Sequence, residues 1–137
     1  MTGLAEFLFP APAERRAGAI WKWWARRRLA YNAWVGTAGA LTVGVGFLLT
    51  VLPPHTNVPP PFLVILRPII AFGVLANVFY TAGPLVEILS HRLFGRQLLP
   101  VGPTLYRMGL TFSVGLALFP MLIMFIGWII SVVTAVF

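Results

Sequence analysis

The residues of this sequence that could carry chemistry gather around one carboxylate, Glu87. Successive members of the group are one to four residues apart, so they align on one face of a helix. The group consists of Asn77, Tyr80, Thr81, Pro84, Glu87 and His91. An ionisable side chain in an apolar segment is costly to bury, and such residues often handle protons or cations. Glu87 is therefore a candidate for a coupling carboxylate in a membrane.

A structural ion pair is the other role open to Glu87. The residue lies close to the predicted cytoplasmic end of its helix, where several arginines come within reach. These are Arg27, Arg28, Arg92 and Arg107. A buried carboxylate held by an arginine fixes how helices pack, and removing one partner is strongly destabilising. We expect the ion pair, and the coupling role stays open as the alternative.

Most other groups that chemistry requires are missing from the sequence. There is no Cys and no Asp, and the acids are Glu6, Glu14 and Glu87, so paired-carboxylate catalysis and thiolate metal sites are not expected. A zinc site takes three or four grouped ligands, but His55 and His91 are predicted to lie on opposite sides of a membrane. The sequence predicts no enzyme activity, no metal and no cofactor.

The composition indicates which elements must position Glu87. Of the 137 residues, 59 % are hydrophobic and 9 % are charged, whereas soluble domains are about 45–50 % apolar and about 25 % charged. Three long apolar segments each approach or exceed the roughly 20 residues that cross a bilayer core. We predict an all-α integral membrane protein of one domain, with three transmembrane helices preceded by a short interfacial N-terminal helix.

The predicted segments are joined by short links. They are a cytoplasmic and interfacial foot at 1–30, spans at 31–52, 62–89 and 104–137, a Pro-rich strap at 53–61 and a second link at 90–103. The prolines of the strap favour extended backbone. The last segment is one long helix or two short helices bent at Pro120, and we favour one helix. The apolar stretch Met1–Pro10 is too short for a typical signal peptide, so we expect it to be retained.

The basic residues predict the orientation of the chain. The formal net charge is +7, and most of the Lys and Arg residues lie in the N-terminal segment or around the second link. Because basic residues stay on the cytoplasmic side, we expect both regions there, with the strap and the C-terminus exoplasmic. The positive charge then sets the orientation of the chain in the membrane and attracts anionic lipids. No nucleic-acid partner is expected.

Tryptophan and arginine are concentrated where the chain enters the first span. Trp and Tyr rings favour the headgroup region, and each Arg near an anionic surface contributes about 1 kcal/mol. The predicted lipid and interface anchors are Trp21, Trp23, Trp24, Arg26 and Tyr31. A docking surface for a partner protein is the alternative use of this segment.

Two stretches resemble a group of known proteins. Residues 23–32, Trp-Trp-Ala-Arg-Arg-Arg-Leu-Ala-Tyr-Asn, are similar to the W-x-x-x-R-R-L-x-Y-N opening of small bacterial inner-membrane proteins with several spans and no assigned activity. Residues 77–87 are similar to the second span of those proteins. The resemblance implies a bacterial inner-membrane protein of this general shape, and it carries over no activity or site residue.

Each predicted span also carries small or polar residues four positions apart, which allow helices to approach closely in a bilayer. They are Gly36, Ala40 and Gly44 in the first span, Gly73, Asn77 and Thr81 in the second, and Gly109, Ser113 and Ala117 in the third. Such stripes fit a compact three-helix bundle, which we favour. They would equally fit contacts with partner subunits or with further copies of the chain in a homo-oligomer.

Two classes of function agree with these observations. The first is a non-catalytic integral subunit, or an assembly or stabilising factor, of a larger bacterial membrane complex, with energy-converting complexes among the candidates. Such a protein would act by helix packing and lipid anchoring, with other integral membrane subunits as partners. The alternative is a small homo-oligomeric transporter or channel subunit that uses Glu87.

Overall fold

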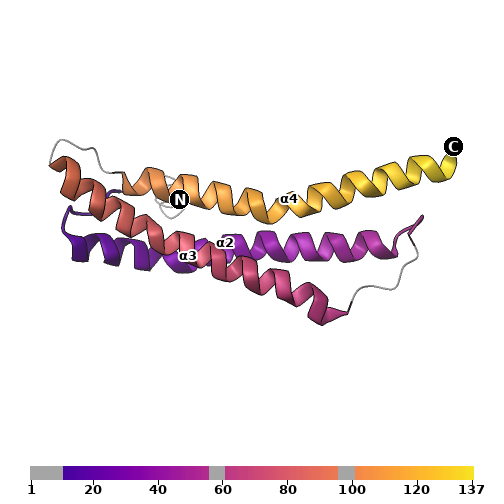
Figure 1. Ribbon diagram of the computed structural model, residues 1–137, viewed down its shortest axis with the longest axis horizontal. Coiled ribbons are helices and arrows are strands. Elements are labelled where there is room, and N and C mark those ends of the chain that lie inside the picture. Colours follow the sequence, from indigo (N-terminus) through magenta and orange to yellow (C-terminus); the bar gives the residue numbers. More distant parts are fainter. Residues whose placement is uncertain (1–10, 56–60, 96–100) are drawn as a thin grey trace, which may run out of the picture.

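The structure, a computed structural model, describes residues 11–55, 61–95 and 101–137. They form the helices α2 (Ala17–Val51), α3 (Phe62–Phe94) and α4 (Gly102–Val136), which are labelled in Figure 1. The described residues contain no strand. Each helix is long and apolar enough to cross a membrane, which confirms the prediction of an all-α protein with three such helices. The predicted retained stretch Met1–Pro10 lies outside the described residues, as do 56–60 of the strap and 96–100 of the second link.

The basic segment before the first span is the beginning of α2. This helix has 35 residues from Ala17 onward, so the described residues do not show a separate short helix ahead of the span. Ala, Leu, Lys and Arg are good helix formers, and neither Gly nor Pro occurs from Ala19 to Val35. The helix therefore runs unbroken through the predicted boundary at residue 30.

Proline or glycine lies at the end of α2, at the end of α3 and at the start of α4. α2 ends at Val51, just before Pro53 and Pro54. α3 extends past the predicted residue 89 to Phe94, and Gly95 follows with a φ of 64°, a positive value that glycine adopts readily. α4 begins at Gly102 and has a proline in its first turn, where no backbone N–H is needed.

The third span is one continuous helix. α4 has 35 residues and contains Pro120 in its interior, so of the two arrangements left open for 104–137 the structure has the single helix. Proline lacks an N–H and its ring crowds the preceding turn, which bends a helix. α4 bends near its middle, where Pro120 lies (Figure 1).

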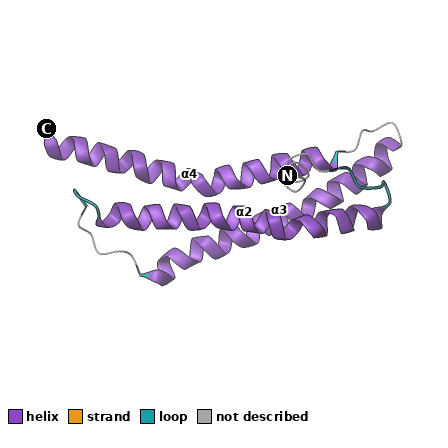
Figure 2. Cartoon of the chain, turned by 180° about the vertical axis from the view of Figure 1, so that it is seen from behind, coloured by secondary structure: helices purple, strands orange, loops and turns teal. Residues whose placement is uncertain are grey.

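The helices pack closely at one end of the molecule and separate toward the other. α2 runs along α4, whereas α3 crosses α2 at an angle, so that the Phe62 end of α3 points away from α4 (Figures 1 and 2). The buried core lies where α2 begins, α3 ends and α4 begins. Its members are Ile20, Trp23, Trp24, Tyr31, Val35, Ala76, Tyr80 and Tyr106.

The other half of the bundle contains an apolar groove between the three helices. Its volume is about 430 Å³, and residues from all three helices line it, including Thr42, Phe72 and Met124. The Thr42 hydroxyl donates a hydrogen bond of 2.7 Å to the carbonyl oxygen of Ala117 and so ties α2 to α4 beside the groove. The three helices thus pack tightly at the end that holds Glu87 (the closed end) and less tightly at the opposite end.

Candidate functional site

Glu87 lies at the point where all three helices meet. Its side chain is only 1 % exposed. From α2, the indole N–H of Trp24 donates a hydrogen bond of 2.7 Å to Glu87 Oε2. From one turn further along α3, the His91 Nε2 atom lies 3.9 Å from Glu87 Oε1. The carboxylate therefore joins α2 to α3 through a buried hydrogen bond.

The contact of Glu87 with α4 depends on Gly102. The carboxylate lies so close to this residue that a Cβ added at Gly102 would collide with both carboxylate oxygens. Gly102 is the first residue of α4, and the N-terminus of a helix carries unpaired N–H groups and a partial positive charge. A carboxylate is favourable at such a position, so Glu87 links the end of α3 to the start of α4 as well.

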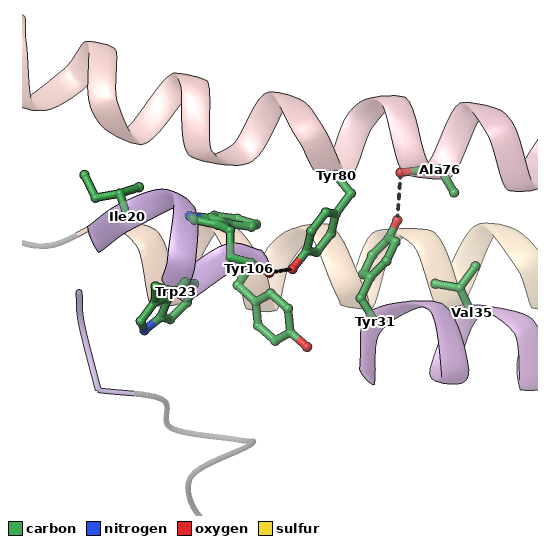
Figure 3. Packing of buried hydrophobic residues seen from close by; sticks show 8 residues of the cluster. Ile20, Trp23, Tyr31, Val35, Ala76, Tyr80 and Tyr106 are labelled. Carbon is green, nitrogen blue, oxygen red and sulfur yellow. Dashed lines mark hydrogen bonds between the residues drawn. The ribbon is translucent and has the colours of Figure 1, made fainter. Parts of the chain in front are cut away.

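Aromatic rings pack around this junction. The Trp24 ring meets Tyr80 and Tyr106 edge to face, with ring centroids 5.3 Å and 6.0 Å away. The Tyr80 hydroxyl donates a hydrogen bond of 2.6 Å to the carbonyl oxygen of Trp24. Figure 3 shows Tyr80 and Tyr106 side by side between the helices. Each such ring pair contributes about 0.5–1.5 kcal/mol beyond the area it buries, so the cluster stabilises the closed end.

Gly83 and Tyr31 make two further contacts between the helices. A Cβ added at Gly83 would collide with the Trp24 ring, so the missing side chain is what allows the indole to lie against α3. Further along α2, the Tyr31 hydroxyl lies 3.2 Å from the carbonyl oxygen of Ala76 and 2.7 Å from the Ser113 hydroxyl oxygen. The bond from Tyr31 to Ala76 is drawn in Figure 3.

The arginines expected to neutralise Glu87 have other contacts. Arg28 donates hydrogen bonds from Nε and Nη2 to Asn77 Oδ1, both 3.2 Å long. Arg28 meets Asn77 because α3 crosses α2 near Arg28. Asn77 lies about 15 Å from Glu87 along α3, at about 1.5 Å per residue. The guanidinium of Arg27 lies 4.0 Å from the centre of the Trp23 ring and donates to the Trp23 carbonyl oxygen.

Arg92 is exposed on α3. The polar contacts that the structure describes for Glu87 therefore come from an indole and an imidazole. Among the described residues, the ion-pair contact of Glu87 is with His91, and the expected pairing of Glu87 with Arg27, Arg28 or Arg92 stays a prediction.

Three of the five predicted lipid anchors point into the bundle. Trp23, Trp24 and Tyr31 belong to the buried core, whereas Trp21 and Arg26 are exposed. The Trp23 indole N–H also donates to the carbonyl oxygen of Ala11. The anchoring role therefore stays a prediction for the exposed Trp21 and Arg26, and the other three rings hold the helices together.

The predicted small-residue stripes divide between the inside and the outside. On α4, Ser113 and Ala117 are buried, whereas Gly109 is exposed. On α2, Gly36, Ala40 and Gly44 are all exposed. A Cβ added at Gly36 or Gly44 would meet no atom of the described chain within 4 Å. The face of α2 that packs inward instead carries Val35, Ala38, Thr42, Gly46 and Leu49.

On α3, the stripe takes part in polar contacts. The Asn77 Nδ2 group donates to Asn32 Oδ1 and to the carbonyl oxygen of Gly73, both at 3.0 Å. The Thr81 hydroxyl donates to the carbonyl oxygen of Asn77 in its own helix. Gly73 is open, since a Cβ there would meet nothing within 4 Å among the described residues.

The described residues 11–55, 61–95 and 101–137 contain no group of three or more His, Cys, Asp or Glu side chains that could hold a metal ion. Comparison with protein-family models, with curated proteins and with solved structures finds no match to this chain. The interpretation of the site therefore rests on its own geometry.

Proposed function

We propose that this chain is a non-catalytic integral subunit, or an assembly or stabilising factor, of a larger bacterial membrane complex. The observation that carries the proposal is the burial of Glu87 between three helices. A carboxylate that moves protons or cations must be reached by water or by the ion, whereas Glu87 is packed against an indole and a helix terminus. Its contacts favour a structural role over the alternative of a transporter or channel that uses Glu87.

The outward faces of the helices support a role in assembly. Many large apolar side chains are exposed on α3 and α4, including Phe79, Phe112 and Phe119. The stripe of Gly36, Ala40 and Gly44 faces outward on α2. Small residues at this spacing allow a second helix to approach closely in a bilayer. We therefore assign this stripe to contact with another integral subunit.

The proposal places the chain in a bacterial inner membrane with its N-terminus and second link on the cytoplasmic side. Helices of 33–35 residues are about 50 Å long, whereas the hydrocarbon core is about 30 Å thick. The first turns of α2 then reach the cytoplasmic headgroups, where the exposed Trp21 and Arg26 would act as interfacial anchors. The C-terminus lies on the exoplasmic side.

Purification of the tagged chain at native expression level in a mild detergent tests this proposal. We expect other integral membrane proteins in a fixed ratio to the chain. Gly36→Leu should remove them because a bulky side chain blocks the close approach of a partner helix. Gly115→Leu is the matched control: Gly115 is exposed on α4, and an added Cβ there meets no described atom within 4 Å. Recovery of the wild-type chain as a pure homo-oligomer would contradict the proposal.

A further inference from the structure

Arg28 forms a polar centre on the outer surface of the bundle. The side chain is exposed, yet its guanidinium is held by two hydrogen bonds to Asn77 Oδ1. Asn77 is itself fixed by its bonds to Asn32 and to the Gly73 carbonyl oxygen. A guanidinium has five N–H donors, and two of them are directed at Asn77. The group is therefore rigidly placed with donors left for a further acceptor.

The position of this guanidinium beside α3 favours an anionic partner. Asn77 lies about 15 Å along the helix from Arg67 and about 22 Å from Arg92. Arg28 lies two residues after Arg26 on α2, so its backbone is near the proposed cytoplasmic headgroup level, while its guanidinium reaches Asn77 near the middle of α3. No carboxylate among the described residues forms an ion pair with it. A guanidinium that reaches from the headgroup region toward an apolar helix face is costly unless it is paired or draws a headgroup toward it.

A shallow apolar hollow adjoins Arg28 on the same surface. It has a volume of about 840 Å³ and follows α3 for several turns. Its walls are formed by Ile70, Val74, Val78 and Leu85, with Gly73 and Ala82 between them. Its polar lining residues are Arg28, Asn77 and Thr81, and Asn77 lies near the middle of its length along α3. The hollow thus combines a cation with a shallow apolar surface along the helix.

We propose that Arg28, Asn77 and this hollow form a binding site for one anionic phospholipid. The lipid phosphate accepts hydrogen bonds from the Arg28 guanidinium, whose planar fork matches two oxygens of a phosphate. Asn77 orients the guanidinium, and an acyl chain lies against α3 in the hollow. The medium around these helices supplies such a ligand, because phospholipid is the anion that is abundant next to a membrane helix.

Native mass spectrometry of the delipidated protein tests the site, with phosphatidylglycerol or phosphatidylcholine added. We expect the wild type to bind one phosphatidylglycerol in preference to phosphatidylcholine, and inorganic phosphate should not displace it. Arg28→Gln should weaken this binding about tenfold, since hydrogen bonds to charged groups are worth enough for such a change. The matched variant Arg67→Gln removes the same charge from an exposed position outside the hollow and should leave the preference intact.

A second pair of variants tests the acyl-chain part of the site. Gly73→Leu places a bulky side chain in the hollow, and an added Cβ there meets no described atom within 4 Å, so we expect a folded protein with weakened lipid binding. Gly115→Leu, on α4, should bind lipid like the wild type. Equal phosphatidylglycerol affinity of Arg28→Gln and Arg67→Gln would overturn the proposal. It would also be overturned if Arg28→Gln lost a co-purified protein while its lipid binding stayed unchanged, because the guanidinium would then serve a partner's carboxylate.

Discussion

Glu87→Ala is expected to lower the free energy of unfolding by about 3–5 kcal/mol, the cost of breaking a buried charged contact by removing one partner. The substitution leaves the Trp24 indole N–H buried without its acceptor and leaves a void between α2, α3 and the first turn of α4. The closed end of the bundle should therefore loosen first. Titration with a denaturing detergent in mixed micelles, followed by tryptophan fluorescence and circular dichroism, measures the change.

A double-mutant cycle with Trp24 distinguishes this explanation from a general effect of altered charge. Trp24→Phe removes the indole donor, so the combined variant should lose less stability than the sum of the two single variants. Glu14→Ala is the control, because Glu14 is exposed before α2 begins, and it should leave the unfolding curve unchanged. A loss for Glu87→Ala no larger than that for Glu14→Ala would contradict the structural role of Glu87.

Gly83→Ala is expected to destabilise the protein by about 1–3 kcal/mol, the usual cost of forcing extra atoms into a packed contact. The added Cβ collides with the Trp24 ring, which cannot move away easily because Glu87, Tyr80 and Tyr106 hold it. The displaced ring should also weaken the bond between the indole and Glu87. The same detergent titration measures the effect.

Gly73→Ala is the matched control for this second prediction. It makes the same chemical change in the same helix, but the new Cβ would meet no atom of the described residues within 4 Å. Alanine favours a helix over glycine by about 0.5–1 kcal/mol, so this variant should be as stable as the wild type or slightly more stable. If Gly83→Ala behaved like Gly73→Ala, the close contact of Trp24 with α3 would be wrong.

The three long helices of the described residues, and most of their ends, could be predicted from the sequence. Long apolar runs define the three spans, and the prolines after Val51 end α2. The exceptions are the start of α2 and the end of α3, which runs past the predicted residue 89 to Phe94. The change from basic to apolar residues near residue 30 suggested a boundary, but a change in polarity does not break a helix when no Gly or Pro accompanies it.

The inward faces could not be predicted, for a physical reason. A helix surrounded by lipid is apolar on all sides, so the distribution of hydrophobic residues does not mark the face that packs inside. On α2 the stripe that begins at Gly36 faces out, whereas the neighbouring stripe that begins at Val35 and includes Thr42 faces in. The predicted packing stripe is therefore one residue away from the stripe that packs inward in the structure.

The importance of Glu87 could be predicted, but its contacts could not. A single carboxylate in an apolar segment stands out in the sequence. Its contact with Gly102 depends on how α3 and α4 are placed relative to each other, and its bond to Trp24 depends on the crossing of α2 and α3. Gly83 and Gly102 carry no signal in a sequence with 13 glycines, because their significance lies in the side chain that approaches them.

The central claim is that Glu87 holds the helices together and does not couple the movement of ions. The most direct test measures ion flux through proteoliposomes that contain either the wild type or Glu87→Gln. Glutamine keeps an oxygen that can accept the Trp24 bond but removes the charge. We predict that neither protein raises proton or cation flux above that of protein-free vesicles, and that Glu87→Gln unfolds at a lower detergent concentration. Flux through the wild-type chain alone that Glu87→Gln abolishes, with unfolding unchanged, would contradict the account.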